Sequence, residues 1–133
     1  MRFFLDNNLA IRHARALNEM VKPDHSFTHL LEKFSGDTKD IDWIRGLARE
    51  GNWVVISGDY RIGKSAHEKR AWHESGLTAF FLKKGWTNIP PLQQHSKLAL
   101  VIEDIISYAR KSPTGSGFMI SVSGKIEPIY SPE

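Results

Sequence analysis

Cysteine is absent from the 133-residue sequence. Its absence excludes disulfides, thiolate zinc sites and cysteine nucleophiles, so the stability of the fold must come from packing. The sequence also lacks any run of the ~20 apolar residues that a membrane-spanning helix needs. The apolar run at residues 2–5 is too short for the core of a signal peptide. We therefore expect a soluble, cytoplasmic protein without a membrane partner.

A strong excess of charge of one sign is also missing. Eighteen Lys and Arg residues against fifteen Asp and Glu residues give a formal net charge of +3, which permits a polyanionic partner without requiring one. Six histidines show no paired spacing of the kind found in zinc motifs. The length and the 41% hydrophobic content fit one domain over residues 1–133.

Apolar runs alternate with amphipathic segments along the chain. We predict strands at residues 2–5, 26–34, 53–57 and 77–82, and a C-terminal hairpin of residues 118–122 and 126–129. Helices are predicted at residues 9–21, from 38 or 40 to 50, at 66–75, and in the long amphipathic segment after the linker 83–91. Residues 26–34 fit a strand or a helix, and the flanking turns favour a strand. The alternation predicts a mostly parallel sheet with ligands at the carboxyl ends of its strands.

Three acids converge on one edge of that predicted sheet. Asp6 ends the first strand, Asp59 follows the strand at 53–57, and Asp40 begins the helix between them. Carboxylate ligands with open positions suit Mg²⁺ or Mn²⁺, and such an ion promotes attack on a phosphodiester. Asp40 could instead be only a helix cap and Asp59 only a turn residue. The pattern favours a divalent-metal site.

The blocks that hold these acids resemble a known family. Residues 4–9 (FLDNNL), 40–51 (DIDWIRGLAREG) and 53–59 (WVVISGD) are similar to the compact PIN-like proteins that often serve as toxins in bacterial toxin–antitoxin pairs. The resemblance covers about the first eighty residues in spaced blocks. It implies a PIN-like three-layer α/β/α sandwich with a central, mostly parallel sheet. It also implies metal-dependent endonucleolytic cleavage of RNA and, for a toxin, inhibition by a cognate antitoxin protein.

The resemblance assigns roles to individual positions. Asp6, Asp40 and Asp59 match the catalytic and metal-binding acids, Ser57 the hydroxyl that orients Asp59, and Asn8 a small polar residue beside the first acid. The sequence departs from the family in two ways, since position 7 is Asn where relatives often carry an acid, and no fourth acid follows Asp59 directly. Asp42 competes with Asp40 for the helix position, although the two point along different sides of a helix.

The loop after the third strand also fits a phosphate-loop pattern. Residues Gly58–Ser65 satisfy G-x-x-x-x-G-K-[ST] between a predicted strand and a predicted helix. In that interpretation Lys64 reaches the terminal phosphates and Ser65 holds Mg²⁺. The bulky side chains at 60–62 disfavour a loop that wraps tightly around phosphate, and the next strand ends in Lys83 and Lys84 without an acid for the metal. In the nuclease interpretation, Lys64 and Arg61 instead hold the substrate phosphate.

Several functions follow from these patterns. The leading one is a Mg²⁺- or Mn²⁺-dependent endoribonuclease that acts on RNA as the toxin of a toxin–antitoxin pair. The alternatives are a catalytically weak or inactive PIN-like module that binds RNA or a protein partner, and a nucleotide-binding protein that uses Gly58–Ser65. Trp86, in the linker, is the aromatic residue that best suits contact with RNA or a partner. A homodimer stays open as an alternative to a monomer.

Overall fold

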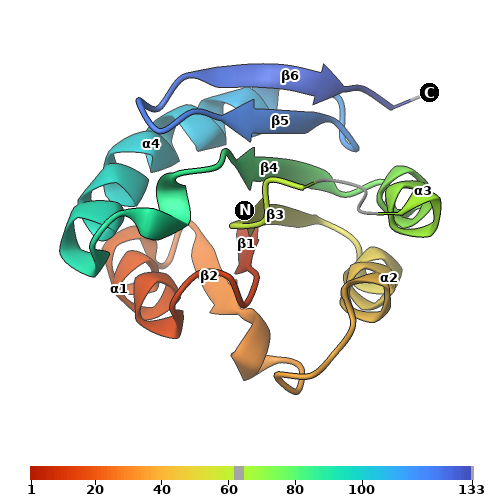
Figure 1. Cartoon of the computed structure of the whole chain (residues 1–133), viewed down its shortest axis with the longest axis horizontal. Helices are drawn as coiled ribbons and strands as arrows, with labels where there is room; N and C mark the ends of the chain where they lie inside the picture. Colours follow the sequence, from red (N-terminus) through yellow and green to blue (C-terminus); the bar gives the residue numbers. More distant parts are fainter. Residues whose placement is uncertain (62–64, 133) are drawn as a thin grey trace.

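Six strands and four α-helices make up the described part of the chain, residues 1–61 and 65–132 of the computed structural model (Figure 1). Two short 3₁₀ helices, Leu30–Glu32 and Trp86–Asn88, lie in the connections between these elements. The elements in chain order are β1 (Arg2–Leu5), α1 (Ile11–Val21), β2 (Ser26–His29), α2 (Asp40–Glu50), β3 (Trp53–Ser57), α3 (Ala66–Ser75), β4 (Thr78–Leu82), α4 (Pro91–Lys111), β5 (Gly117–Ile120) and β6 (Ile126–Tyr130). None of the helices in these residues is long and apolar enough to cross a membrane.

The strands form one sheet in the order β2-β1-β3-β4-β5-β6. The pairings from β2 to β5 are all parallel, and β6 pairs with β5 in the antiparallel direction. Leu5, at the end of β1, lies opposite Ile56 of β3, so the carboxyl ends of these two strands share one edge of the sheet. The predicted α/β class, the mostly parallel sheet and the C-terminal hairpin are confirmed.

Helices cover both faces of the sheet, as the alternation of side chains along the strands requires. Phe3 and Leu5 point into a core shared with α1 and α4, whereas Phe4 points into a second core shared with α2 and α3. The two helix pairs lie on opposite sides of the sheet in Figure 1. The molecule is therefore the predicted three-layer α/β/α sandwich.

The segment 26–34 differs from the predicted strand. Its strand ends at His29, whose side chain accepts a hydrogen bond from the backbone N–H of Leu31 at 3.0 Å and begins the 3₁₀ helix. The Glu32 carboxylate in turn accepts the His29 backbone N–H at 2.9 Å. Leu30 still packs in the core shared with α2 and α3, which explains why its apolar character looked like a longer strand.

Candidate functional site

Asp6 is the centre of a polar cluster at the carboxyl edge of the sheet. Its side chain is only 4% exposed because it follows a strand that is buried on both faces. Oδ1 accepts the backbone N–H groups of Asn8 and Gly58, each at 3.1 Å, and Oδ2 accepts the hydroxyl of Ser57. These three donors satisfy the buried carboxylate and fix its orientation.

Ser57 links Asp6 to the second acid. Its hydroxyl donates to Asp6 and accepts the backbone N–H of Asp59 at 3.1 Å. The Asp59 carboxylate accepts the Arg61 backbone N–H at 2.9 Å and pairs with the Arg61 guanidinium at 3.3 Å. The Asp59 side chain is 13% exposed, whereas that of Arg61 is 61% exposed. The loop after β3 therefore holds Asp59 beside Asp6 and places a cation at the mouth of the site.

Asp40 is the third acid, at the first position of α2. Its Oδ1 accepts the indole N–H of Trp43 at 3.1 Å, which orients the carboxylate. Asp40 lines the same cavity as Asp6 and Asp59. Asp42 is exposed and does not line it, so the geometry favours Asp40 over Asp42 for the helix position.

The electrostatics of the cluster oppose ionisation of Asp6. Burial raises the pKa of the Asp6 carboxyl above 3.8, the hydrogen bonds from Ser57, Gly58 and Asn8 counteract part of that rise, and the negative charge of Asp40 adds to it. A carboxylate held in this way gains from any cation that enters the site.

Glu68 is a fourth acid at the cavity that the sequence analysis missed. It lies in the first turn of α3, where its backbone N–H donates to the hydroxyl of Ser65 at 3.1 Å. The Ser-x-x-Glu spacing of 65–68 is the signal of a helix start, and that role alone explains it in the sequence. In the structure Glu68 lines the cavity with Asp6, Asp40 and Asp59. Helix α3 thus adds a fourth carboxylate to the lining of this cavity.

The cavity between these acids fits a small hard cation in size and chemistry. It leaves room of about 10 Å³, roughly one water-sized sphere. Its four carboxylates are oxygen donors of the kind that Mg²⁺ and Mn²⁺ prefer. Over residues 1–61 and 65–132, however, no three His, Asp or Glu side chains are already gathered closely enough to hold a metal ion. The donor set therefore fits a divalent cation in chemistry, although these carboxylates are not already gathered as a ligand set.

The remaining predicted residues have different placements. The Asn8 side chain is exposed, and the residue reaches Asp6 through its backbone N–H. Lys64 lies outside the described residues. In the loop Gly58–Ser65, the N–H of Gly58 is bonded to Asp6 and that of Arg61 to Asp59. These donors are engaged by carboxylates, so the described part of the loop favours an acidic site over a phosphate cradle.

Two histidines form a second buried polar cluster, which the sequence did not indicate. The Nδ1 atoms of His13 and His95 are 3.0 Å apart, and Nε2 of His13 is 2.7 Å from the amide oxygen of Gln94. The Gln94 amide nitrogen donates to the Trp86 carbonyl at 2.8 Å. We call His13, Gln94 and His95 the histidine cluster. It joins α1 to α4, on the face of the sheet opposite to α2 and α3.

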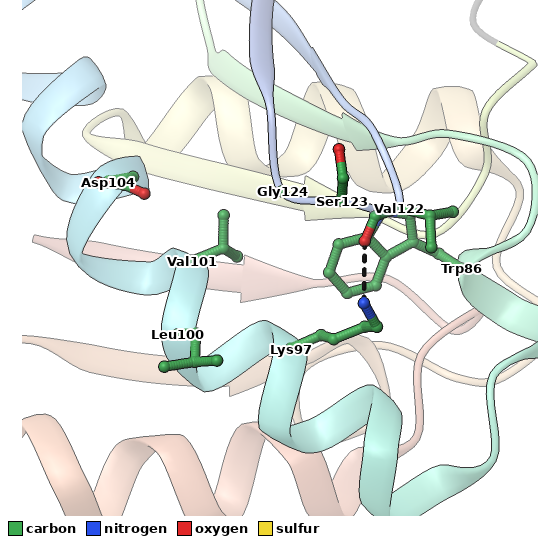
Figure 2. A pocket seen from close by; sticks show the side chains of 8 residues that line it. All are labelled: Trp86, Lys97, Leu100, Val101, Asp104, Val122, Ser123 and Gly124. Carbon is green, nitrogen blue, oxygen red and sulfur yellow. Dashed lines mark hydrogen bonds between the residues drawn. The ribbon is translucent and has the colours of Figure 1, made fainter.

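A further cavity, of about 180 Å³, lies between α4 and the loop that joins β5 to β6 (Figure 2). Lys97 of α4 lines this cavity, and its ammonium group donates to the Val122 carbonyl at 3.2 Å. Among the described residues that line it, Asp104 is the one acid. Trp86 borders it but is 1% exposed, and its indole N–H donates to the Ser121 carbonyl at 2.9 Å. The expectation that Trp86 contacts RNA or a partner is therefore wrong, because this tryptophan is part of the core.

Comparison with known proteins agrees with this architecture. A family model described as a PIN like domain matches residues 1–84, which is 84 of the 133 residues and more than half of the chain. The matched segment runs from β1 past the end of β4 and includes Asp6, Asp40, Asp59 and Glu68. This is a nuclease-type fold. Neither the curated proteins nor the solved structures contain a match. The chain belongs to the PIN-like domain family.

Proposed function

We propose that the protein is a Mg²⁺- or Mn²⁺-dependent endoribonuclease that cuts RNA phosphodiesters at the acidic cavity. The observation that carries this proposal is the convergence of Asp6, Asp40, Asp59 and Glu68 on one small cavity at the carboxyl edge of the sheet. Acids placed together oppose one another's ionisation, as the charge of Asp40 does for Asp6. A divalent cation between them relieves that repulsion, which a purely structural role would not require.

Asp6 and Asp59 would hold the ion, with Asp40 and Glu68 completing the donor set. A divalent cation bound there supplies Lewis-acid stabilisation of the charge that develops on the phosphate. The sequence around the site provides the positioning. Ser57, Asn8 and Gly58 fix the Asp6 carboxylate through three hydrogen bonds.

Arg61 would contact the substrate. Its guanidinium is largely exposed and lies at the mouth of the cavity, against Asp59. A guanidinium matches the geometry of a phosphate oxygen pair, and the ion pair with Asp59 keeps it close to the scissile bond. The walls of the cavity are the rings of Trp43, Trp72 and Phe81, which limit the access of water and strengthen each electrostatic contact inside.

The family resemblance extends the proposal to a biological role as the toxin of a toxin–antitoxin pair, with a cognate antitoxin as the partner. Expression of the wild-type chain should then arrest growth, and expression of the Asp59→Asn variant should not. Growth at the normal rate with active wild-type enzyme in the cell would remove the toxin role and leave the nuclease proposal standing.

A binding module without catalysis is the second candidate. It is favoured by one observation, that the described acids are not already gathered as a set of metal ligands. The two candidates are separated by incubating the purified protein with RNA in EDTA and then in Mg²⁺ or Mn²⁺. Cleavage that appears only with the cation supports the nuclease. RNA binding with no cleavage under any of these conditions supports the binding module.

A further inference from the structure

A second depression of the surface adjoins the acidic cavity. It is a groove of about 520 Å³ between α3 and the strands β5 and β6, and it is lined among others by Tyr60, Lys69, His73 and Tyr130. Its volume lies within the range of about 300–1,000 Å³ that is typical of sites for small organic groups. We call it the aromatic groove.

The aromatic groove and the acidic cavity share part of their lining. Arg61 and Trp72 line both of them, so a chain that crosses Arg61 passes from one into the other. Helix α3 divides its polar residues between the two. Glu68 faces the cavity, while Lys69 and His73, which are four residues apart and on one side of the helix, face the groove.

The charge of the groove is opposite to that of the cavity. Arg61 and Lys69 contribute two cations, both on exposed side chains, and no Asp or Glu lines the groove among the described residues. A polyanion that presents one phosphate to the cavity would therefore meet cations along the groove. This arrangement suits the neighbouring phosphates of a nucleic acid chain.

The aromatic side chains of the groove are placed to contact a flat ring. Tyr60 is 40% exposed, so its ring is open to a ligand at the surface. The Tyr130 ring lies 4.9 Å from that of His73, at an interplanar angle of 48°. It rests on Gly117, where a Cβ would overlap the ring, so the absence of a side chain at 117 makes room for Tyr130.

We propose that the aromatic groove binds an unpaired nucleobase of a single-stranded RNA whose neighbouring phosphate enters the acidic cavity. The base stacks on Tyr60 and against the Tyr130 and His73 rings, and Lys69 contacts the adjoining phosphate. This inference rests on the proposed nuclease function and defines its substrate as single-stranded. A base inside a duplex is stacked and paired, and its faces cannot enter such a groove.

Part of this groove lies outside the segment that defines the family. The family model ends at residue 84, whereas Met119, Ile129 and Tyr130 come from the C-terminal hairpin. The hairpin thereby supplies one wall of the groove from outside the matched segment.

The test measures binding of a fluorescent single-stranded RNA oligonucleotide to the Asp6→Asn variant, which prevents cleavage during the measurement. Adding Tyr60→Ala should raise the dissociation constant about fivefold or more, because a stacked base contributes about that much or more to affinity. Adding Lys69→Ala should raise it less and reduce its dependence on salt. Binding of a duplex of the same sequence should change less than about twofold with Tyr60→Ala, since a paired base makes no stacking contact there.

Matched controls come from the opposite face of the molecule. Tyr108 on α4 is 39% exposed, nearly the same as Tyr60, so Tyr108→Ala should leave binding unchanged, as should Lys111→Ala for Lys69→Ala. Unchanged affinity in the Tyr60→Ala variant, or an equal loss of affinity for single strand and duplex, would overturn the proposal that the aromatic groove binds an unpaired base.

The outcome also separates this inference from the proposed function. If the wild-type protein cuts no RNA but Tyr60→Ala still weakens single-strand binding selectively, the groove is supported and the nuclease proposal fails. If the wild-type protein cuts RNA and Tyr60→Ala changes neither binding nor the preference for single strands, the nuclease proposal is supported and the groove fails.

Discussion

The acidic cavity and the histidine cluster are two buried polar regions with different physical explanations. In the histidine cluster, Nε2–H of His13 donates to the Gln94 amide oxygen at 2.7 Å, and Nδ1 of His13 lies 3.0 Å from Nδ1 of His95. Both ring nitrogens of His13 therefore have a partner within the protein. The acidic cavity instead gathers four carboxylates, with the Arg61 guanidinium paired to one of them, Asp59.

This difference indicates which of the two buried polar regions has a physical reason to bind a ligand. The histidine cluster is complete within the protein, so its contribution to the stability of the α1 and α4 contact accounts for it. The Asp6 carboxylate of the acidic cavity is oriented by three neutral donors, which do not cancel its charge, and the charge of Asp40 opposes its ionisation. Under the proposed function a divalent cation explains the acidic cavity, whereas the histidine cluster is explained without one.

The largest expected effect is a loss of RNA cleavage when an acid of the acidic cavity is replaced. Asp59→Asn should reduce metal-dependent RNA cleavage by at least about a hundredfold, since even indirect partners of a metal ligand contribute about tenfold to a hundredfold. Asp42→Asn is the matched control, because Asp42 is exposed on the same edge and does not line the cavity. Equal loss of cleavage in the two variants would contradict the assignment of Asp59.

The histidine cluster should show the reverse behaviour. His13→Ala removes a ring that is 2% exposed and leaves the Gln94 amide oxygen without its donor, so the free energy of unfolding should fall by about 2 kcal/mol or more. RNA cleavage per folded molecule should stay unchanged. Arg12→Ala, at the exposed neighbour, should leave stability within about 0.5 kcal/mol of the wild type. A selective loss of RNA cleavage in His13→Ala would contradict the claim that the histidine cluster contributes only to stability.

Glu68 provides a smaller test of the acidic cavity. Glu68→Gln keeps the shape and the helix N-terminus but removes one charge from the cavity, and we expect cleavage to fall about tenfold with a higher requirement for Mn²⁺. Glu74 lies on the same helix and does not line the cavity, so Glu74→Gln is the control. If Glu68→Gln cleaves RNA like Glu74→Gln, the fourth acid has only its role at the helix start.

The smallest expected effect is a difference in pH dependence. Asp6 has a raised pKa, so the folded state binds its proton more tightly, and the stability from this group declines as the pH rises above 3.8. Burial lowers the pKa of His13, with a further contribution from His95, so its stability is lost as the pH falls below 6.5. In EDTA, Asp6→Asn should remove the first slope and His13→Ala the second. Urea unfolding from about pH 4 to pH 8 measures both.

Local sequence patterns predicted most of the fold. The continuous β-branched run at 53–57 predicts a buried strand, and the structure places β3 over Trp53–Ser57. The pattern failed at 26–34, because a cap formed by His29 ends the strand while apolar residues continue into the 3₁₀ helix. Such a cap depends on the side-chain hydrogen bonds of one residue, which a hydrophobic pattern does not contain.

The residues of the site likewise fall into those that the sequence predicts and those that only the packing reveals. Asp6 and Asp59 follow strands directly, so topology alone brings them to one edge of the sheet. Glu68 reaches the cavity only through the packing of α3, and its sequence spacing already had an explanation as a helix start. His13 and His95 are 82 positions apart, and no local pattern joins them. Trp86 looked exposed because of its linker, yet packing placed it in the core.

The most direct test of the central claim is a side-by-side measurement of stability and RNA cleavage for Asp6→Asn. The amide oxygen that this substitution introduces can accept the N–H groups of Asn8 and Gly58, and the Ser57 hydroxyl can turn to accept from the new amide nitrogen. Removal of a buried charge should therefore keep or raise the melting temperature near neutral pH, while Mn²⁺-dependent cleavage disappears. A folded Asp6→Asn variant that cuts RNA at the wild-type rate would contradict the claim that this acid cluster is the active site.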